Sequence, residues 1–250
     1  MYYSRYSFLF DPKSKEPFKL SRSKIDLFVQ CERCFYLDRR YGIKRPDFPA
    51  FTLNNAVDIL LKKEFDIHRA KKESHPLMAK YGIKAIPYEH EKMDEWRHNF
   101  TGVQALHQET NFLVYGAIDD LWINEDNEIM VVDYKATSTS QEIDMDSKWK
   151  IGFKRQMEIY QWLLRHSPDF LGQEISSQGY FVYVNGRADK EAFDAKLEFD
   201  VQIIPHLGKD DWVDKTLLDA HKCLMQENLP KPAEDCEYCK YRQNAQKLEK

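Results

Sequence analysis

The sequence predicts a single α/β domain that spans residues 1–250. β-forming residues gather in the middle of the chain, between Thr101 and Ala136, with amphipathic helical patterns before and after them. A long helical pattern then separates a strand at 129–136 from another at 175–185. If those two strands run parallel, the helix between them is a crossover, which is the connection that parallel strands need.

Helical patterns dominate the first part of the chain. Residues 1–20 have no clear period, so we expect an irregular arm there. An apolar stripe over 21–41 predicts a helix that a serine can cap and that Gly42 can end. A second helix is predicted over 54–70, and its buried side is expected to carry Val57, Leu60, Leu61 and Phe65. Residues 71–100 are polar and contain two prolines, and a short helix is expected near 89–100.

Strand patterns begin after residue 100. The predicted order is strands at 101–110, 112–124 and 129–136, a helix at 149–166, strands at 175–185 and 197–204, and a helix at 210–227. The acidic stretch 125–128 joins the second and third strands as a tight turn. Met130, Val131 and Val132 form a continuous apolar run, which is typical of a central strand covered on both faces.

Overall composition places few limits on function. The formal net charge is −4, which does not indicate a nucleic-acid binder and does not exclude one, because the local distribution of Lys and Arg decides phosphate binding. No apolar run approaches the roughly 18 residues that a membrane span needs. The N-terminus has no signal-peptide pattern, so we expect a soluble, cytoplasmic protein. A phosphate-cradling glycine-rich loop is also missing, so ATP-driven unwinding is not expected.

Two acids and a lysine stand out in the stretch from residue 116 to residue 135. Asp119 belongs to the predicted strand 112–124, and Asp133 and Lys135 belong to the next strand with Tyr134 between them. Side chains alternate along a strand, so Asp133 and Lys135 share a face and Tyr134 points away. Such a group suits a Mg²⁺ ion and a phosphate. The simpler alternative is an exposed ion pair on an edge strand, but unpaired charge is costly in so apolar a strand.

Three short motifs in this order resemble those of the PD-(D/E)XK nuclease superfamily, in its RecB-like branch. They are GxxD at 116–119, DYK at 133–135 and QxxxY at 156–160, and the resemblance extends from about residue 21 to residue 241. That branch includes recombination nuclease domains and iron–sulfur CRISPR-associated exonucleases. The resemblance implies a restriction-endonuclease-like core, with a central mixed sheet flanked by helices. It also implies a metal-dependent DNA nuclease of DNA repair, recombination or defence, and it leaves endonuclease and exonuclease action open.

Site roles follow from the resemblance together with the chemistry of each residue. Asp119 and Asp133 supply hard oxygen ligands for Mg²⁺ or Mn²⁺, and the resemblance adds the carbonyl of Tyr134 as a further ligand. Lys135 would orient the attacking water or stabilise charge on the phosphate. Gln156 and Tyr160 share one helix face, so both could reach the phosphate or brace the lysine. The alternative is that Gln156 faces solvent and Tyr160 lies in the core, with no role at the site.

One position departs from the RecB-like pattern. That branch carries GxxxH on an early helix, with the histidine as a metal ligand, whereas the matching stretch here runs from Asn54 to Asp58. Asp58 can ligate Mg²⁺, and it could equally be a solvent-facing helix residue. This departure keeps open a noncatalytic DNA-binding or partner-binding module on the same fold.

Four of the five cysteines form two CxxC pairs. Cys31 and Cys34 lie on the predicted helix 21–41, and Cys236 and Cys239 lie on a tail expected to form a turn. In a reducing compartment such pairs indicate metal ligation, here by a Zn²⁺ ion or a 4Fe–4S cluster that would staple 31–34 to 236–239. The cluster-bearing relatives usually place one cysteine near the N-terminal helix and three in the tail. Packing residues and free thiols are the alternative, and a protein with only a structural zinc ion is a third. Cys223 is expected in the core.

The basic residues before Gln156 and the eight histidines are further candidates for function. Lys148, Lys150, Lys154 and Arg155 precede Gln156 and could follow a DNA backbone, or they form a solvated helix face. The eight histidines contain no pair spaced three or four apart, so no helical metal-ligand pair arises from them. The oligomeric state is left open by the sequence.

Overall fold

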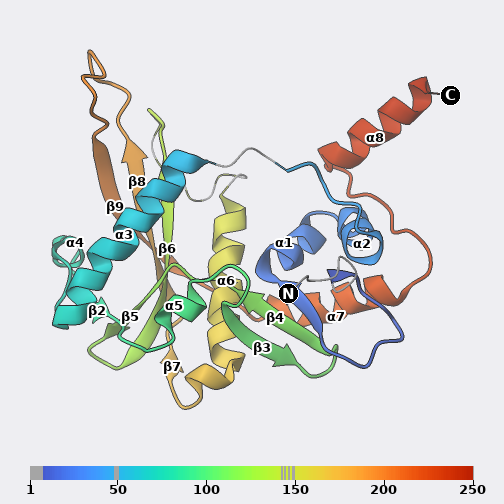
Figure 1. Cartoon of the computed structure of the whole chain (residues 1–250), viewed down its shortest axis with the longest axis horizontal. Coiled ribbons are helices and arrows are strands. Elements are labelled where there is room, and N and C mark those ends of the chain that lie inside the picture. Colours follow the sequence, from blue (N-terminus) through green and yellow to red (C-terminus); the bar gives the residue numbers. More distant parts are fainter. Residues whose placement is uncertain are drawn as a thin grey trace, which may run out of the picture. The chain divides into compact units, whose positions relative to one another are not determined.

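The computed structural model describes residues 8–47, 51–141, 143, 145, 147 and 150–249 (Figure 1). The chain divides into two compact units. One is built from Met1–Pro49, Ala105–Tyr115 and Asp211–Lys250, and the other from Ala50–Gln104 and Gly116–Asp210. The single domain expected over residues 1–250 stays a prediction.

A six-stranded mixed sheet forms the centre of the larger unit. Its strands are β2 (Ala85–Pro87), β5 (Asp120–Asn124), β6 (Glu128–Thr137), β7 (Glu174–Ile175), β8 (Gln178–Gly186) and β9 (Phe199–Leu207). The order is β2-β5-β6-β8-β9, with β7 also paired to β6. β5 and β6 form an antiparallel hairpin, whereas β6 and β8 run parallel and β8 and β9 antiparallel. The parallel pairing confirms the expected crossover through the helix between β6 and β8.

Helices cover both faces of this sheet. They are α3 (Thr52–Lys71), α4 (Pro76–Lys80), α5 (Met93–Trp96) and α6 (Ile151–His166), and a 3₁₀ turn, η2 (Pro168–Phe170), follows α6. Leu61 and Phe65 of α3 pack into a core cluster with Val132 and Tyr134 of β6. Asp133, between those two residues, instead contacts α6 through Gln156. Because neighbouring side chains on a strand point to opposite faces, α3 and α6 cover opposite faces of β6 (Figure 1).

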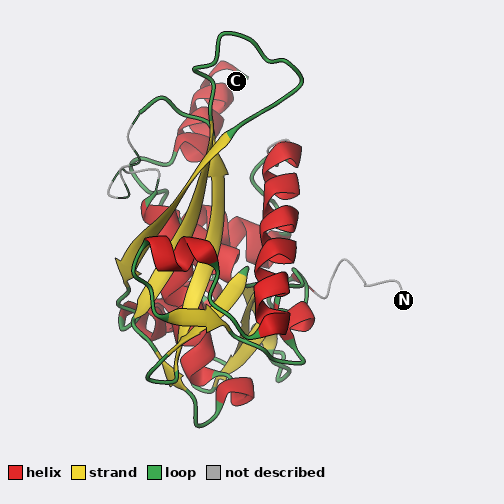
Figure 2. Ribbon diagram, turned by 90° about the vertical axis from the view of Figure 1, so that its left-hand side faces the viewer, coloured by secondary structure: helices red, strands yellow, loops and turns green. Residues whose placement is uncertain are grey.

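The connection between β8 and β9 is the longest hairpin loop of the described chain. It covers residues 187–198, and Figure 2 shows it projecting beyond the ends of the strands. Its charged side chains pair locally, because Arg187 binds Asp189 at 2.7 Å and Lys190 binds Glu198 at 2.7 Å. The long hairpin thus ends in a polar, internally paired loop.

The smaller unit combines helices with a three-stranded sheet. Its elements are β1 (Phe18–Ser21), α1 (Arg22–Gln30), α2 (Glu32–Tyr41), most of β3 (Val103–His107) and β4 (Phe112–Gly116), α7 (Trp212–Met225) and α8 (Glu237–Leu248). The sheet order is β1-β4-β3, and β1 runs parallel to β4. Gly42 ends α2 in the left-handed conformation at φ 70°, as expected for a helix stop.

Two expected continuous elements are each broken in the structure. The helix expected over 21–41 divides at Cys31, which is extended at φ −167° and ψ 106° and precedes α2. The strand expected over 112–124 divides at residues 117–119, so β4 joins the smaller sheet and β5 the larger one. In both places the residue pattern suits one element throughout, and tertiary packing interrupts it.

Several smaller expectations were also wrong. Phe18–Ser21 is a strand rather than part of an irregular arm, β2 was missed, and the tail expected to be a turn contains α8. Leu60 is 63% exposed, because the buried side of α3 follows Leu61 and Phe65 at a spacing of four. Among the described residues, every helix is too short or too polar to cross a membrane.

Candidate active site

Asp133 and Lys135 lie on β6, between β5 and β8 in the larger sheet. Asp133 is fully buried, and its carboxylate forms an ion pair with the Lys135 ammonium. The ring of Tyr134 points to the opposite face, where its hydroxyl donates a hydrogen bond of 2.7 Å to Asp120. The expected alternation is therefore confirmed, and the pair does not lie on an exposed edge strand.

Asp119 lies in the short connection immediately before β5, rather than within a strand. Its carboxylate accepts a 2.9 Å hydrogen bond from the backbone amide of Tyr134 and a 3.1 Å bond from the Lys62 ammonium. The amide of Tyr134 lies between Asp133 and Lys135 in the chain. This hydrogen bond therefore fastens the Asp119 connection to the part of β6 that carries the other two charges.

Gln156 and Tyr160 approach the same carboxylate from α6. The Gln156 side-chain amide donates hydrogen bonds of 2.9 Å to Asp133 Oδ1 and 3.1 Å to the Tyr160 hydroxyl. The glycine of the GxxD motif leaves room for Tyr160, because a Cβ on Gly116 would lie 2.7 Å from the Tyr160 ring. Gln156 thus does not point into solvent, and Tyr160 is both buried and part of the hydrogen-bonded site.

Asp58 reaches this group through a lysine that the sequence interpretation missed. The Lys62 ammonium lies 2.8 Å from Asp58 and 3.1 Å from Asp119, so it bridges two carboxylates from different elements. Lys62 is one helical turn after Asp58, and this i, i+4 spacing was the signal that could have found it. At the start of α3, Asn54 donates a 2.8 Å hydrogen bond to the Ala136 carbonyl, which ties this helix to β6. Asp58 therefore faces the candidate site.

The carboxylates differ in their proton affinity. Burial raises the pKa of Asp133 to about 7, and the nearby Asp119 charge adds to the rise against the opposing effect of Lys135. Burial acts on Asp119 too, but Lys62, Lys135 and the Tyr134 amide outweigh it and lower the pKa of Asp119. Burial and the Asp119 charge raise the pKa of Asp58. Neighbouring groups with opposed pKa shifts are typical of functional sites.

A buried ionic network on the Tyr134 side of β6 supports the site. Asp120 is fully buried, forms an ion pair with Arg69 and accepts a 3.2 Å bond from Arg97 as well as the Tyr134 hydroxyl bond. Arg97 also donates a 2.9 Å hydrogen bond to the backbone carbonyl of Asp119. Asp120 thus has a structural role. No sequence motif marked the two arginines, of which Arg69 holds Asp120 and Arg97 holds both Asp120 and the connection that carries Asp119.

The oxygen atoms of this site suit a divalent cation. Both oxygens of the buried Asp133 carboxylate have polar partners, because Oδ1 accepts a hydrogen bond from Gln156 and Oδ2 pairs with the Lys135 ammonium. A second carboxylate, that of Asp119, is close enough to raise the pKa of Asp133. Carboxylate oxygens are the hard donors that Mg²⁺ and Mn²⁺ prefer. The residues present therefore fit the metal that the resemblance implies.

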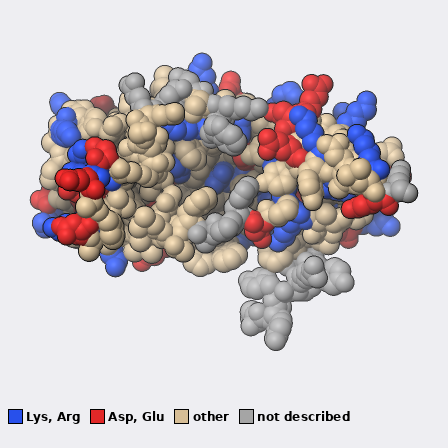
Figure 3. All heavy atoms as spheres, turned by 90° about the horizontal axis from the view of Figure 1, so that it is seen from above, with Lys and Arg blue, Asp and Glu red and all other residues tan. Residues whose placement is uncertain are grey.

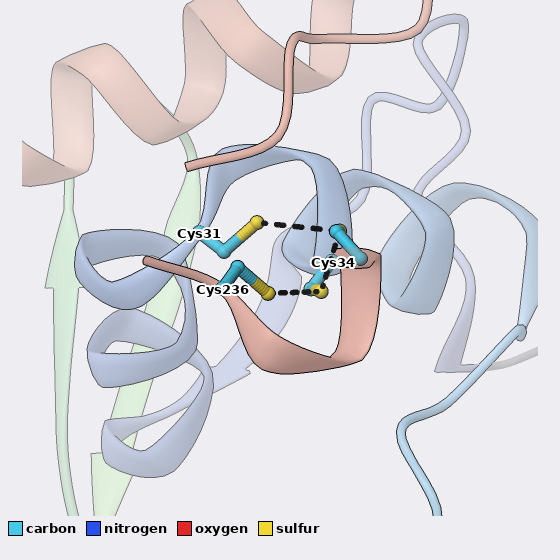
Figure 4. Close-up of side chains that lie close together, drawn as sticks. Cys31, Cys34 and Cys236 are labelled. Carbon is cyan, nitrogen blue, oxygen red and sulfur yellow. Dashed lines mark hydrogen bonds between the residues drawn. The ribbon is translucent and has the colours of Figure 1, made fainter. Parts of the chain in front are cut away.

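Four cysteines form a second candidate metal centre, in the smaller unit. Cys31 precedes α2 and Cys34 lies in its first turn, while Cys236 precedes α8 and Cys239 lies in its first turn. Figure 4 shows the side chains of Cys31, Cys34 and Cys236 pointing toward one another. The Sγ atoms of Cys34 lie 3.6 Å from those of Cys236 and Cys239, and Cys31 lies 3.9 Å from Cys239. Within the described ranges, this is the only group in which three or more His, Cys, Asp or Glu side chains could together hold one ion.

Arg45 lies against the cysteine group. Its guanidinium is 3.6 Å from the sulfur of Cys236 and stacks over the Tyr238 ring at 4.6 Å. Burial raises the pKa of Cys34. Several thiolates so close together therefore need a positive charge, such as a metal ion, to stabilise them. Cys223 lies elsewhere in the core, and burial raises its pKa to about 12, as expected for a packing residue.

The basic residues before Gln156 are only partly described. Lys148 lies outside the described residues, whereas Lys154 and Arg155 are half-buried on α6 and Lys150 stacks over the Tyr183 ring at 5.1 Å. On the face drawn in Figure 3, acidic and basic side chains are interspersed. Lys150, Lys154 and Arg155 offer positive charge shortly before Gln156 in the chain.

Comparison with known proteins places the chain in a family. A family model described as the PD-(D/E)XK nuclease superfamily matches residues 19–244. Similar solved structures include SSO0001 (16% identity, TM-score 0.44, 92% of this chain and 86% of that chain). Another is a "Putative exonuclease" from Eubacterium rectale (12% identity, TM-score 0.43, 89% of this chain and 87% of that chain). No curated protein matches the sequence.

The mixed sheet flanked by helices agrees with the restriction-endonuclease-like core of the matched superfamily. The four clustered cysteines match the number of cysteine ligands in the iron–sulfur-type branch of that superfamily. The chain belongs to the PD-(D/E)XK nuclease superfamily.

Proposed function

We propose that this protein is a metal-dependent nuclease that hydrolyses phosphodiester bonds of DNA. One observation carries the proposal: the carboxylates of Asp119 and Asp133 are placed together with the Lys135 ammonium, which forms an ion pair with the fully buried Asp133. Membership of a nuclease superfamily supports the same conclusion. We also propose that the protein acts in the cytoplasm, in DNA repair, recombination or defence.

Each residue at the site has a role that its contacts allow. Asp119 and Asp133 would hold Mg²⁺ or Mn²⁺, with the Tyr134 carbonyl as a further ligand that the family resemblance implies. A bound ion of this kind polarises the scissile phosphate and lowers the pKa of an attacking water. The Lys135 ammonium is held by Asp133 and can stabilise negative charge that develops on the phosphate. Gln156 orients the Asp133 carboxylate and is itself held by the Tyr160 hydroxyl.

A nuclease assay with site variants tests the proposal. Purified protein is incubated with single- and double-stranded DNA, linear and circular, in Mg²⁺ or Mn²⁺ and in a chelator. The expected result is cleavage that needs the metal and falls by at least about a thousandfold in Asp133→Asn and in Lys135→Met, because both changes remove charge that acts on the transition state. Lys190→Met is a matched control, since this lysine lies on the exposed β8–β9 loop. Folded wild-type protein that cleaves no substrate tested would contradict the proposal.

A noncatalytic DNA-binding module on the same fold is the second candidate. The observation that favours it is Asp58 in the position where the RecB-like pattern has histidine, together with the Lys62 ammonium between Asp58 and Asp119. Mn²⁺ calorimetry distinguishes the two candidates. The nuclease should bind Mn²⁺ in a manner that Asp119→Ala removes, whereas the binding module should bind DNA and show no such metal site.

For the cysteine centre we propose a single tetrahedral Zn²⁺ ion that staples 31–34 to 236–239. Four sulfurs at about 2.3 Å from one zinc ion lie about 3.8 Å apart in a tetrahedron. The three Sγ distances given above are 3.6, 3.6 and 3.9 Å, and all four atoms lie within 4.8 Å of one another. A 4Fe–4S cluster binds each cysteine to a different iron, so its ligands stand farther apart than those around one ion. The spacing therefore supports zinc over the cluster.

Metal analysis tests this second part. Protein purified without oxygen should be colourless, contain about one zinc ion per chain and little iron, and lose the zinc in Cys34→Ser. Cys223→Ser is the matched control, because this buried cysteine lies outside the group and should keep full zinc content. A brown protein with a broad visible absorption band and about four irons per chain would establish the cluster instead.

A further inference from the structure

The Lys62 ammonium occupies an unusual position at the candidate active site. It is 2.8 Å from Oδ2 of Asp58 and 3.1 Å from Oδ1 of Asp119, and its side chain is 20% exposed. Asp58 and Lys62 come from α3, whereas Asp119 comes from the connection before β5. The ammonium thus links two carboxylates that belong to separate elements, and one of them is the proposed metal ligand Asp119.

The balance of charge explains why an ammonium lies there. Asp58 and Asp119 share the Lys62 ammonium, and Asp119 is hydrogen-bonded to the amide of Tyr134, the residue next to Asp133. Of these three carboxylates, Lys135 contacts only that of Asp133 at ion-pair distance. Partly buried carboxylates close together repel one another and need a compensating cation. Lys62 supplies this cation to the two carboxylates that Lys135 does not contact at ion-pair distance.

We propose that Lys62 is a resident counter-cation, which holds Asp58 and Asp119 in place in the metal-free protein and must be displaced when a divalent ion binds. This proposal rests on the metal-dependent function proposed above. An ammonium and a divalent ion cannot both lie about 3 Å from the same carboxylate oxygens without strong repulsion. The lysine has a path away from the site, because its side chain is partly exposed and long enough to turn toward solvent.

The consequence is a metal affinity that Lys62 sets by competition. Removing the ammonium leaves the two carboxylates without their cation, so an added divalent ion gains attraction and no longer has to displace a charge. Lys62→Met and Lys62→Gln should therefore bind Mn²⁺ about tenfold more tightly than the wild type. Lys62→Arg keeps the positive charge and should stay within about threefold of wild-type affinity.

Isothermal titration calorimetry with Mn²⁺ tests the proposal without any measurement of cleavage. Binding at the candidate active site is defined as the part that Asp133→Asn abolishes, which excludes any ion taken up by the cysteines. Lys63→Met is the matched control, because Lys63 is the next residue on α3 and is exposed. Thermal melts confirm that each variant is folded, and the Met and Gln variants provide independent readings of the same charge removal.

The possible outcomes separate this proposal from the proposed function. Tighter binding in both neutral variants, with Lys62→Arg and Lys63→Met unchanged, supports the counter-cation. Equal or weaker binding in the neutral variants, with an Asp133-dependent site present in the wild type, overturns it and leaves the nuclease proposal standing. If neither the wild type nor the neutral variants bind Mn²⁺ through Asp133, both proposals fail.

Discussion

Metal binding at the candidate active site should weaken sharply on acidification. Burial raises the pKa of Asp133 to about 7 in the metal-free protein, so this carboxyl group holds a proton over much of the weakly acidic range. A carboxylate must lose that proton before it can ligate a metal ion. Metal binding and proton release are therefore linked at one residue.

The size of the effect follows from this pKa. With a value of about 7, about nine tenths of Asp133 is ionised near pH 8 and about one tenth near pH 6. The apparent affinity for Mn²⁺ should thus fall about tenfold between these conditions, which corresponds to about 1.4 kcal/mol. The binding reaction should release close to one proton near pH 6 and very little near pH 8.

Calorimetry in two buffers of different ionisation enthalpy measures both quantities. The dependence of the binding heat on buffer gives the number of protons released, and the titration itself gives the affinity. Asp133→Asn is the control, since it removes the titrating group together with the ligand. An Asp133-dependent affinity that is the same near pH 6 and near pH 8 would refute the reasoning, because it would mean that Asp133 is already ionised in the metal-free protein.

Three further predictions follow from the same contacts. The substitution Gly116→Ala places a methyl group 2.7 Å from the Tyr160 ring, so it should cost about 1–3 kcal/mol in urea unfolding and lower the rate of DNA cleavage. Arg69→Met removes one ion-pair partner of the fully buried Asp120 and should cost about 3 kcal/mol in the same assay, whereas Lys71→Met on the exposed side of α3 should cost little. In the metal-free protein, stability should fall by a few kcal/mol as the pH rises from about 4 to about 7, because the raised pKa of Asp133 makes the folded state hold a proton that the unfolded state has lost. Asp133→Asn should abolish that part of the pH dependence in urea melts.

Local patterns were sufficient to predict most elements of the larger unit. The apolar run before Asp133 predicted a central strand, and the helix before residue 175 predicted a crossover that the parallel β6–β8 pairing confirmed. The same patterns failed where tertiary contacts decided the outcome. The division at Cys31 and the division after Gly116 fall inside stretches whose residues suit one continuous element.

The candidate site shows the same limit. Spacing alone placed Asp133 and Lys135 on one face of a strand and Gln156 one helical turn before Tyr160, because those relations depend only on strand and helix periods. It could not show that Gln156 bonds to Asp133, since that contact joins residues 23 positions apart in the chain. The role of Lys62 was missed for the same reason, because its second partner, Asp119, lies 57 positions away.

The sequence by itself determined the identity of the chemical groups. It supplied two acids, a lysine and a glutamine in the order of a PD-(D/E)XK nuclease, and two CxxC pairs about 200 residues apart. Only the tertiary structure decided which charges meet. It placed an ammonium between Asp58 and Asp119, buried Asp133 so that its pKa rises, and brought four sulfurs to the spacing of a single ion. Charge interactions depend on distance and burial, and both are set by how distant segments pack rather than by their order in the chain.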